Sequence, residues 1–188
     1  MVLFELDKII KSKYKIKNKN LGNTINLSFE EYKKKCYEKI FEIFTLYFTG
    51  ISEKYIEDLF LNNKSKILFI TIGDKFVLNN IISIIIYHKT SSKNKIKYYV
   101  LCFGIHKKFR KFGYGKYSLD EFVYWIKSKN KSNKVKIILL KSVESSLNFY
   151  LTYGFIITNL YSNKLFYKYE SLNELKNNLE KILEFTIE

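Results

Sequence analysis

One short segment of the sequence has the residue types and spacing of a phosphate-binding turn. Arg110, the only arginine among 33 basic residues, begins an Arg-x-x-Gly-x-Gly pattern that ends at Gly115. An apolar run before this segment is expected to be a strand, and an amphipathic run after it is expected to be a helix. The free N–H groups and the dipole of a helix N-terminus attract anions, and glycines allow close approach. The segment therefore predicts a turn that binds phosphate.

A second segment strengthens this interpretation. Tyr150 is expected near the end of a helix, four residues before Gly154-Phe155, where a strand is expected to begin. The arginine-glycine segment alone is weak evidence, because it matches neither the dinucleotide-binding nor the Walker glycine pattern. The evidence lies in the presence of both segments, in this order, in one chain.

Together the two segments resemble the GCN5-related N-acetyltransferase (GNAT) superfamily, closely over residues 67–169 and loosely before them. The resemblance implies acetyl-CoA as cosubstrate and no metal. Backbone amides of residues 111–116 would hold its pyrophosphate, the strand at 101–105 would pair with its pantetheine arm, and Tyr150 would protonate the departing thiolate. We expect Arg110 to order the turn and to add positive charge beside the phosphates. The residues placed at the cofactor are Phe103, Gly104, Ile105, Arg110, Lys111, Phe112, Gly113, Tyr114, Gly115, Lys116, Ser146 and Tyr150.

Within the superfamily the pattern is most similar to the NatE/San type of N-alpha-acetyltransferase catalytic subunit. That similarity implies that Tyr99 helps to deprotonate the amine, so the predicted catalytic residues are Tyr99 and Tyr150. It also implies a peptide acceptor in contact with Leu101, Phe166 and Tyr167. Deprotonation needs a positioned relay, which Tyr99 and ordered water could form, and the amide near Phe103 could stabilise the oxyanion.

The sequence departs from the NatE/San pattern at four positions. Ile138 stands where that pattern has a catalytic histidine, and Phe48 and Ile51 stand where it has a peptide-binding proline and tyrosine. Val143 replaces the asparagine that opens the last helix. A GNAT fold tolerates these changes, but specificity for a peptide N-terminus does not follow from the pattern. The similarity makes a protein N-terminus the expected acceptor, with a small amine or an amino sugar such as glucosamine 6-phosphate as the alternative.

Other residues that could do chemistry have simpler structural interpretations. Tyr99 is one of 16 tyrosines, so a buried structural role competes with the catalytic one. His106 follows the strand directly and is expected at the surface or as a weak phosphate contact. His88 is expected to be structural or solvated, and Cys102 to pack in the core.

The pattern of elements predicts one α+β domain over residues 1–188, with acceptor-side helices in 1–62 and an acetyl-CoA-binding core in 63–170. The resemblance makes this an α/β/α sandwich around a mixed, mostly antiparallel sheet. Residues 1–28 are ambiguous. The expected elements are helices at 28–50 and 52–60, strands at 67–72, 76–78 and 81–87 with a turn at 79–80, a loop at 89–97, a strand at 98–105, a helix through 119–126, a strand at 135–140, a helix at 144–153, and strands at 155–160 and 165–169.

Composition limits the partners. The net charge of +15 could favour nucleic acid as a partner. However, the lysines are scattered along a chain without alanine, proline or glutamine, which indicates drift toward AT-rich codons on a solvated surface. A catalytically inactive GNAT-fold adaptor or nucleic-acid-binding module remains the alternative of another class. Two cysteines without metal spacing, no apolar run long enough to span a membrane and no signal peptide favour a cytoplasmic protein. The expected partners are acetyl-CoA, an amine acceptor and an auxiliary acetyltransferase subunit.

Overall fold

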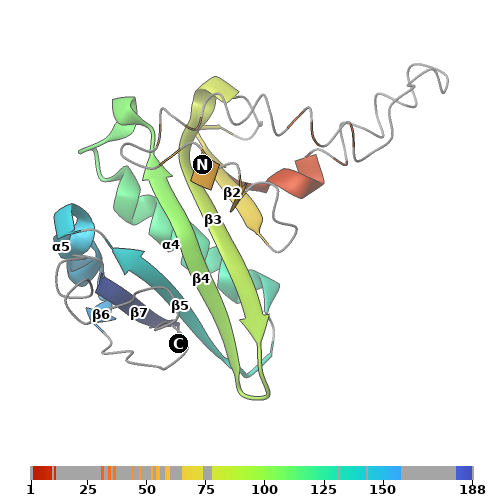
Figure 1. Cartoon of the computed structure of the whole chain (residues 1–188), viewed down its shortest axis with the longest axis vertical. Helices are drawn as coiled ribbons and strands as arrows, with labels where there is room; N and C mark the ends of the chain where they lie inside the picture. Colours follow the sequence, from red (N-terminus) through yellow and green to blue (C-terminus); the bar gives the residue numbers. More distant parts are fainter. Residues whose placement is uncertain are drawn as a thin grey trace. The chain divides into compact units, whose positions relative to one another are not determined.

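The computed structural model combines helices with seven strands in the part of the chain that it describes (Figure 1). It describes residues 2–9, 11, 31, 34, 36, 44, 47, 52, 54, 55, 58, 59, 65–73, 78–130, 132–142, 144–157 and 181–187. The elements are β1 (Val2–Glu5), β2 (Lys66–Thr71), the 3-10 helix η1 (Leu78–Asn80), β3 (Ile81–Ser91), β4 (Lys95–Ile105), the 3-10 helix η2 (Lys107–Phe109), α4 (Tyr114–Lys129), β5 (Val135–Ser142), α5 (Glu144–Tyr153), β6 (Ile156–Ile157) and β7 (Lys181–Ile187).

The strands belong to a mixed sheet with the order β1-β2-β3-β4-β5-β7-β6. Most of the described pairs are antiparallel, and β4 pairs with β5 in parallel. The predicted α+β class with a mixed, mostly antiparallel sheet is therefore confirmed. The chain divides into two compact units, one of Met1–His88 with Cys102–Lys129 and one of Lys89–Leu101 with Asn130–Glu188.

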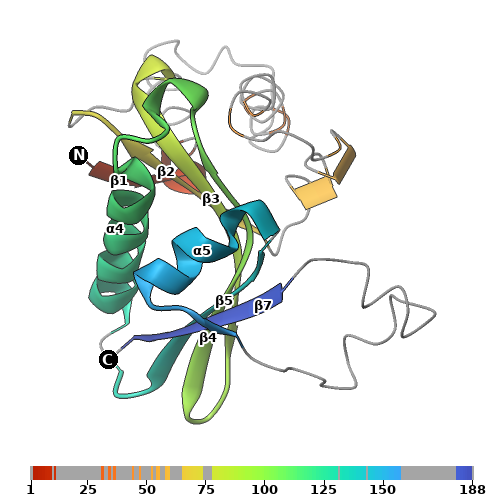
Figure 2. The same cartoon turned by 90° about the vertical axis from the view of Figure 1, so that its left-hand side faces the viewer.

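In the first unit, the apolar runs of β2 and β3 form the core. Residues 67–71 and 81–87 are buried without interruption, which is the pattern of strands covered on both faces. The helix α4 buries Leu119, Phe122 and Ile126, which recur at helical spacing as the sequence predicted. The Phe122 ring lies 5.6 Å from that of Tyr87 on β3. Figure 2 shows α4 beside β1, with which it is in contact.

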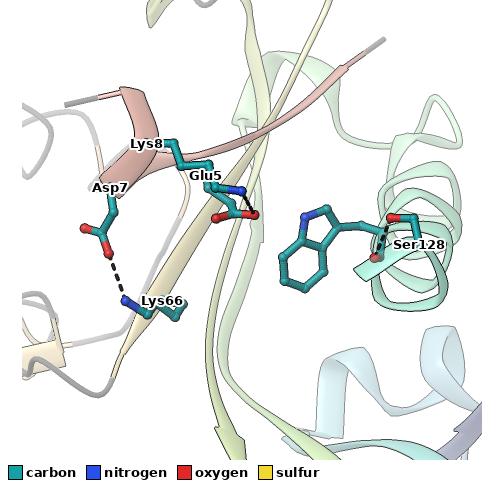
Figure 3. A network of polar contacts seen from close by, with 6 residues as sticks. Glu5, Asp7, Lys8, Lys66 and Ser128 are labelled. Atoms are coloured by element: carbon teal, nitrogen blue, oxygen red, sulfur yellow. Dashed lines mark hydrogen bonds and ion pairs between the residues drawn. The ribbon is translucent and has the colours of Figure 1, made fainter. Parts of the chain in front are cut away.

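Polar contacts in the first unit involve the N-terminal residues and the end of α4. Asp7 accepts a hydrogen bond from the Lys66 ammonium at 3.0 Å, across 59 positions of sequence, and Glu5 accepts one from Lys8 at 2.8 Å (Figure 3). The Ser128 hydroxyl donates to the Trp125 carbonyl at 2.8 Å in the last turn of α4. Both ion pairs are exposed, so each contributes at most about 1 kcal/mol.

The loop predicted at residues 89–97 is wrong, because most of it is strand. β3 continues to Ser91 and β4 begins at Lys95, so only residues 92–94 form the turn, where the Ser92 N–H donates to the Lys95 carbonyl at 2.8 Å. Lys95 and Lys97 are exposed while Ile96 is buried. Such alternation is typical of a half-buried strand, so the lysines mark its outer face.

In the second unit, β5 pairs with β4 on one side and with β7 on the other. The β4–β5 register runs from Lys95 opposite Val135 to Val100 opposite Leu140, although both strands continue further. The helix α5 contacts β7 (Figure 2). β7 was not predicted; it pairs with β5 and with β6 and lies between them in the sheet order. Of the expected closing strands, 155–160 is described as β6 alone, and 165–169 lies outside the described residues.

Several other predictions fall partly outside the described residues. Of the helix expected at 28–50, residues 31, 34, 36, 44 and 47 are described; the first four are helical and Tyr47 lies in a turn. The start of the next helix agrees with its prediction, because the Tyr55 N–H donates to Ser52 Oγ at 3.2 Å, as an N-cap requires. Leu78 belongs to η1 and not to a strand, and the Asn80 carbonyl accepts from the Ile72 N–H at 2.9 Å. No helix in the described part of the chain is long and apolar enough to span a membrane.

Candidate functional site

The arginine-glycine segment forms a tight turn that leads into α4. Two of its residues have left-handed backbones, Lys111 with φ 68° and Gly113 with φ 81°. The Gly113 carbonyl accepts the Tyr117 N–H at 3.2 Å, which makes Gly113 the N-cap of α4. A glycine N-cap has no side chain that could accept the N–H groups of the first helical turn. These groups are therefore available to an external acceptor.

The charges and the exposure of the turn suit an anion. The first turn of α4 holds no acidic residue, and Lys111 and Gly113 are exposed. A Cβ added at Gly113 would meet no atom within 4 Å, so the backbone there faces open space. One turn along the helix, the Asp120 carboxylate accepts a hydrogen bond from the Lys116 ammonium at 2.9 Å. Within the first unit, the turn thus presents free donors, a positive helix end and local cations.

The Arg110 side chain holds the turn together through main-chain acceptors. Its Nε donates to the Ile105 carbonyl at 3.1 Å, and its Nη2 donates to the Tyr47 carbonyl at 2.9 Å. The guanidinium therefore joins the end of β4 to a residue 63 positions earlier in the chain. Its part in ordering the turn agrees with the expectation from the sequence.

His106 is built into the approach to the turn. Its N–H donates to the Ile82 carbonyl at 2.9 Å, and its Nδ1 accepts the Lys108 N–H at 3.2 Å, capping η2. Burial first, and then the charges of Lys108 and Arg110, lower the pKa of this imidazole below 6.5. The neutral ring needed for its acceptor role is thus favoured. His88 is also structural, with its Nε2 2.9 Å from Ser65 Oγ.

Residues predicted to face the ligand share one face of β4. Along the strand, the even-numbered residues from Ile96 to Gly104 are buried and the odd-numbered residues from Tyr99 to Ile105 are half-buried. Tyr99, Leu101 and Phe103 therefore point to the same side of the strand. Tyr98 points the other way and accepts a hydrogen bond from the Asn130 amide, while burial raises the pKa of its phenol.

The position expected to hold a histidine base is apolar. Ile138 is fully buried on β5, opposite Tyr98. β5 itself, Val135–Ser142, contains no histidine or carboxylate. This strand therefore offers neither a histidine nor a carboxylate as a base.

Tyr150 is fixed by the turn that ends α5. Its carbonyl accepts the N–H groups of Gly154 at 3.2 Å and Phe155 at 3.0 Å, and the Gly154 N–H also approaches the Leu151 carbonyl at 3.0 Å. This is a Schellman motif, with glycine at φ 114°. The Tyr150 ring is buried and lies 5.4 Å from that of Phe155 and 5.0 Å from that of Phe149.

The remaining predicted residues are placed as follows. Cys102 is buried, and burial raises the pKa of its thiol to about 12, so it packs in the core as predicted. Ser146 is half-buried on α5. Among the described residues, no group of three or more metal-ligating side chains is placed to hold a metal. The positions that lie outside the described residues are Phe48, Ile51, Val143, Phe166 and Tyr167.

Sequence reasoning missed Tyr47, which the structure places at the turn. Tyr47 is buried, donates its phenol proton to the Ile81 carbonyl at 2.9 Å, and contacts the His106 ring with 5.1 Å between centroids. No sequence signal could have identified Tyr47, because it accepts the Arg110 hydrogen bond through its main-chain carbonyl, which every residue type has.

Comparison with known proteins supports the fold. No protein-family model and no curated protein matches the sequence. The structure is similar to that of GCN5 from Tetrahymena, with a TM-score of 0.56 and 13% identity over 82% of this chain and 88% of that chain. Two further similar structures are Naa50 of Arabidopsis thaliana in complex with the bisubstrate analogue CoA-Ac-MVNAL (TM-score 0.49, 18% identity, 80% and 92% covered) and the ribosomal-protein-S18-alanine N-acetyltransferase of Escherichia coli (0.48, 10%, 79% and 85%). The similarity to GCN5 shows that this chain has the GNAT acetyltransferase fold.

Proposed function

We propose that this protein is a cytoplasmic N-acetyltransferase that transfers an acetyl group from acetyl-CoA to a primary amine. The acceptor that we propose first is a protein N-terminus. The observation that carries the proposal is the turn before α4. It combines a glycine N-cap, a first helical turn without acidic residues and an exposed backbone, on a GNAT fold. These properties fit the pyrophosphate of acetyl-CoA, which carries two negative charges and needs several donors.

In this proposal, cosubstrate binding and proton transfer are assigned to different residues. The amides of residues 111–116 bind the pyrophosphate, and Arg110 holds the turn in the binding conformation. Bound acetyl-CoA supplies an acetyl group activated as a thioester. The amine nitrogen bonds to the acetyl carbon as the carbon–sulfur bond breaks, and the Tyr150 phenol gives its proton to the sulfur.

The amine proton leaves by a different route. Tyr99 is half-buried on β4, and its phenol with ordered water serves as the relay, because β5 offers no base at Ile138. A relay is sufficient when a fraction of the amine is already neutral at the working pH. Tyr150 recovers its proton from solvent after the thiol leaves.

Isothermal titration with acetyl-CoA tests the cosubstrate. Gly115→Asp places a carboxylate in the first turn of α4, where it should leave the helix stable but occupy the donors intended for phosphate. We expect the wild type to bind and the variant to lose binding at least about tenfold, as charge repulsion and lost hydrogen bonds require. Tyr124→Asp is the control, since it adds the same charge at a side chain 71% exposed on the same helix. Equal binding by all three proteins, or none by the wild type, would refute the proposal.

A thiol-release assay identifies the acceptor. The panel contains a peptide with a free N-terminus, the same peptide with its N-terminus blocked and a lysine exposed, and glucosamine 6-phosphate. Turnover on the first alone supports a protein N-terminus. Turnover on the sugar phosphate alone would replace the peptide with an amino sugar while retaining the cosubstrate.

A further inference from the structure

Tyr47 has contacts on every side that fix the orientation of its main-chain carbonyl. Its N–H donates to the Phe44 carbonyl at 2.9 Å, and its phenol donates to the Ile81 carbonyl at 2.9 Å, at the start of β3. Its ring meets the edge of the His106 ring at 5.1 Å and 83°. Burial raises the pKa of the phenol, so the donor keeps its proton at every physiological pH. The carbonyl of residue 47 is therefore a rigid acceptor.

The Arg110 fork connects this acceptor to the turn. One arm reaches the Tyr47 carbonyl at 2.9 Å, and Nε reaches the Ile105 carbonyl at 3.1 Å, at the last residue of β4. A guanidinium is planar, so fixing two of its donors fixes its plane and restricts where the Arg110 backbone can lie. The next residue, Lys111, takes a left-handed backbone at φ 68° that costs an ordinary residue free energy. Such a conformation persists only where surrounding contacts impose it.

We propose that Tyr47 is a positioning residue for the phosphate-binding turn, acting through the Arg110 fork, so that affinity for the pyrophosphate depends on the carbonyl of residue 47. The proposal rests on the function proposed above. It gives Arg110 a role through its geometry and not through its charge. Residue 47, in the N-terminal part of the chain, thereby sets how well the turn before α4 binds its ligand.

The first test separates geometry from charge. Arg110→Lys keeps the charge and removes the fork, so we expect about tenfold weaker acetyl-CoA binding, as for loss of one charge-assisted hydrogen bond. Lys107→Gln removes a charge from an exposed residue of η2 and should weaken binding less. If Arg110→Lys binds as the wild type does while Lys107→Gln weakens binding, charge is what matters and the proposal is wrong.

The second test is a double-mutant cycle. Tyr47→Phe retains the ring and the carbonyl but removes the bond to Ile81, so we expect about threefold to tenfold weaker binding. Because both changes act on one carbonyl, the double variant with Arg110→Lys should bind about as weakly as Arg110→Lys alone. Tyr117→Phe is the matched control, since its phenol donates to Glu121 on α4 at 2.7 Å, and its effect should add. Additive effects of Tyr47→Phe and Arg110→Lys would overturn the proposal.

Hydrogen exchange tests the positioning without any ligand. The Phe109 and Arg110 amides donate to the His106 and Lys107 carbonyls in η2, at 2.8 and 3.3 Å, and report whether the chain that enters the turn stays ordered. Exchange in this segment should be about tenfold faster in Tyr47→Phe, and unchanged in Tyr117→Phe. Unchanged exchange in Tyr47→Phe would overturn the positioning role even if acetyl-CoA binds. Faster exchange in Tyr47→Phe, together with a wild type that binds no acetyl-CoA, would support the positioning role and reject the proposed function. If Arg110→Lys does not fold, acetyl-CoA binding and hydrogen exchange of Tyr47→Phe against Tyr117→Phe still test the proposal.

Discussion

Replacing Gly113 by alanine separates what the turn contributes to stability from what it contributes to binding. Gly113 has φ 81° and Gly73 has φ 85°, and a Cβ at either would meet no atom within 4 Å. Each alanine therefore costs only the strain of a left-handed backbone, ~1–2 kcal/mol. For a domain of this size the melting temperature should fall by about 2–8 °C in either variant.

The two variants should differ in binding. Gly73 lies outside the turn, so Gly73→Ala should bind acetyl-CoA as the wild type does. At Gly113 the methyl group either stands on the binding surface or forces the turn to relax. The N–H groups of the first turn of α4 then no longer point at the phosphate. Loss of one charge-assisted hydrogen bond at ~1.5–3 kcal/mol corresponds to about 10–100-fold weaker binding.

The assay pairs thermal unfolding with isothermal titration on both variants. We expect equal losses of melting temperature and a loss of binding in Gly113→Ala alone. If Gly113→Ala binds as tightly as Gly73→Ala, the glycine backbone of this turn does not contact the ligand and the reasoning fails. A much larger loss of stability at Gly113 would show that strain is not the only cost there.

Three further predictions concern Tyr150, Cys102 and His106. Tyr150→Phe should reduce turnover at least about tenfold while leaving the dissociation constant of acetyl-CoA nearly unchanged, because only the acid is lost; an equal change in both would indicate a binding role. In Cys36→Ser, the remaining Cys102 thiol should resist a disulfide reagent at mildly alkaline pH until denaturant is added, because its pKa is raised to about 12, and labelling of the native protein would contradict its burial. The pKa of His106 is lowered in the folded state, so its contribution to stability is present above the unfolded pKa and is lost as pH falls below about 6.5. Melting curves should show this loss of stability in the wild type and less of it in His106→Asn. Identical pH profiles of the melting temperature in the two proteins would show that His106 is not its cause.

The sequence predicted those features that depend on a few neighbouring residues. The turn before α4 needs a left-handed backbone and a free helix end, and Gly113 specifies both locally. The Schellman motif after α5 depends on Gly154 and on the apolar Phe155 that follows it. The buried stripe of α4 follows from the spacing of its apolar residues. The error at 89–97 came from reading exposed lysines as a loop, although Ile96 between them already indicated alternation.

Long-range pairing was decided only by the tertiary structure. β7 lies between β5 and β6 because of hydrogen bonds between main chains, and these bonds carry no residue signature that names a partner strand. The acceptor of Arg110 is likewise a main-chain carbonyl, 63 positions away, and every residue type has such a carbonyl. Composition and spacing therefore predicted a turn suited to phosphate at Arg110. Only the folded chain determined that its guanidinium is bound to Tyr47, because side chains specify local conformation, whereas the fold decides which backbones meet.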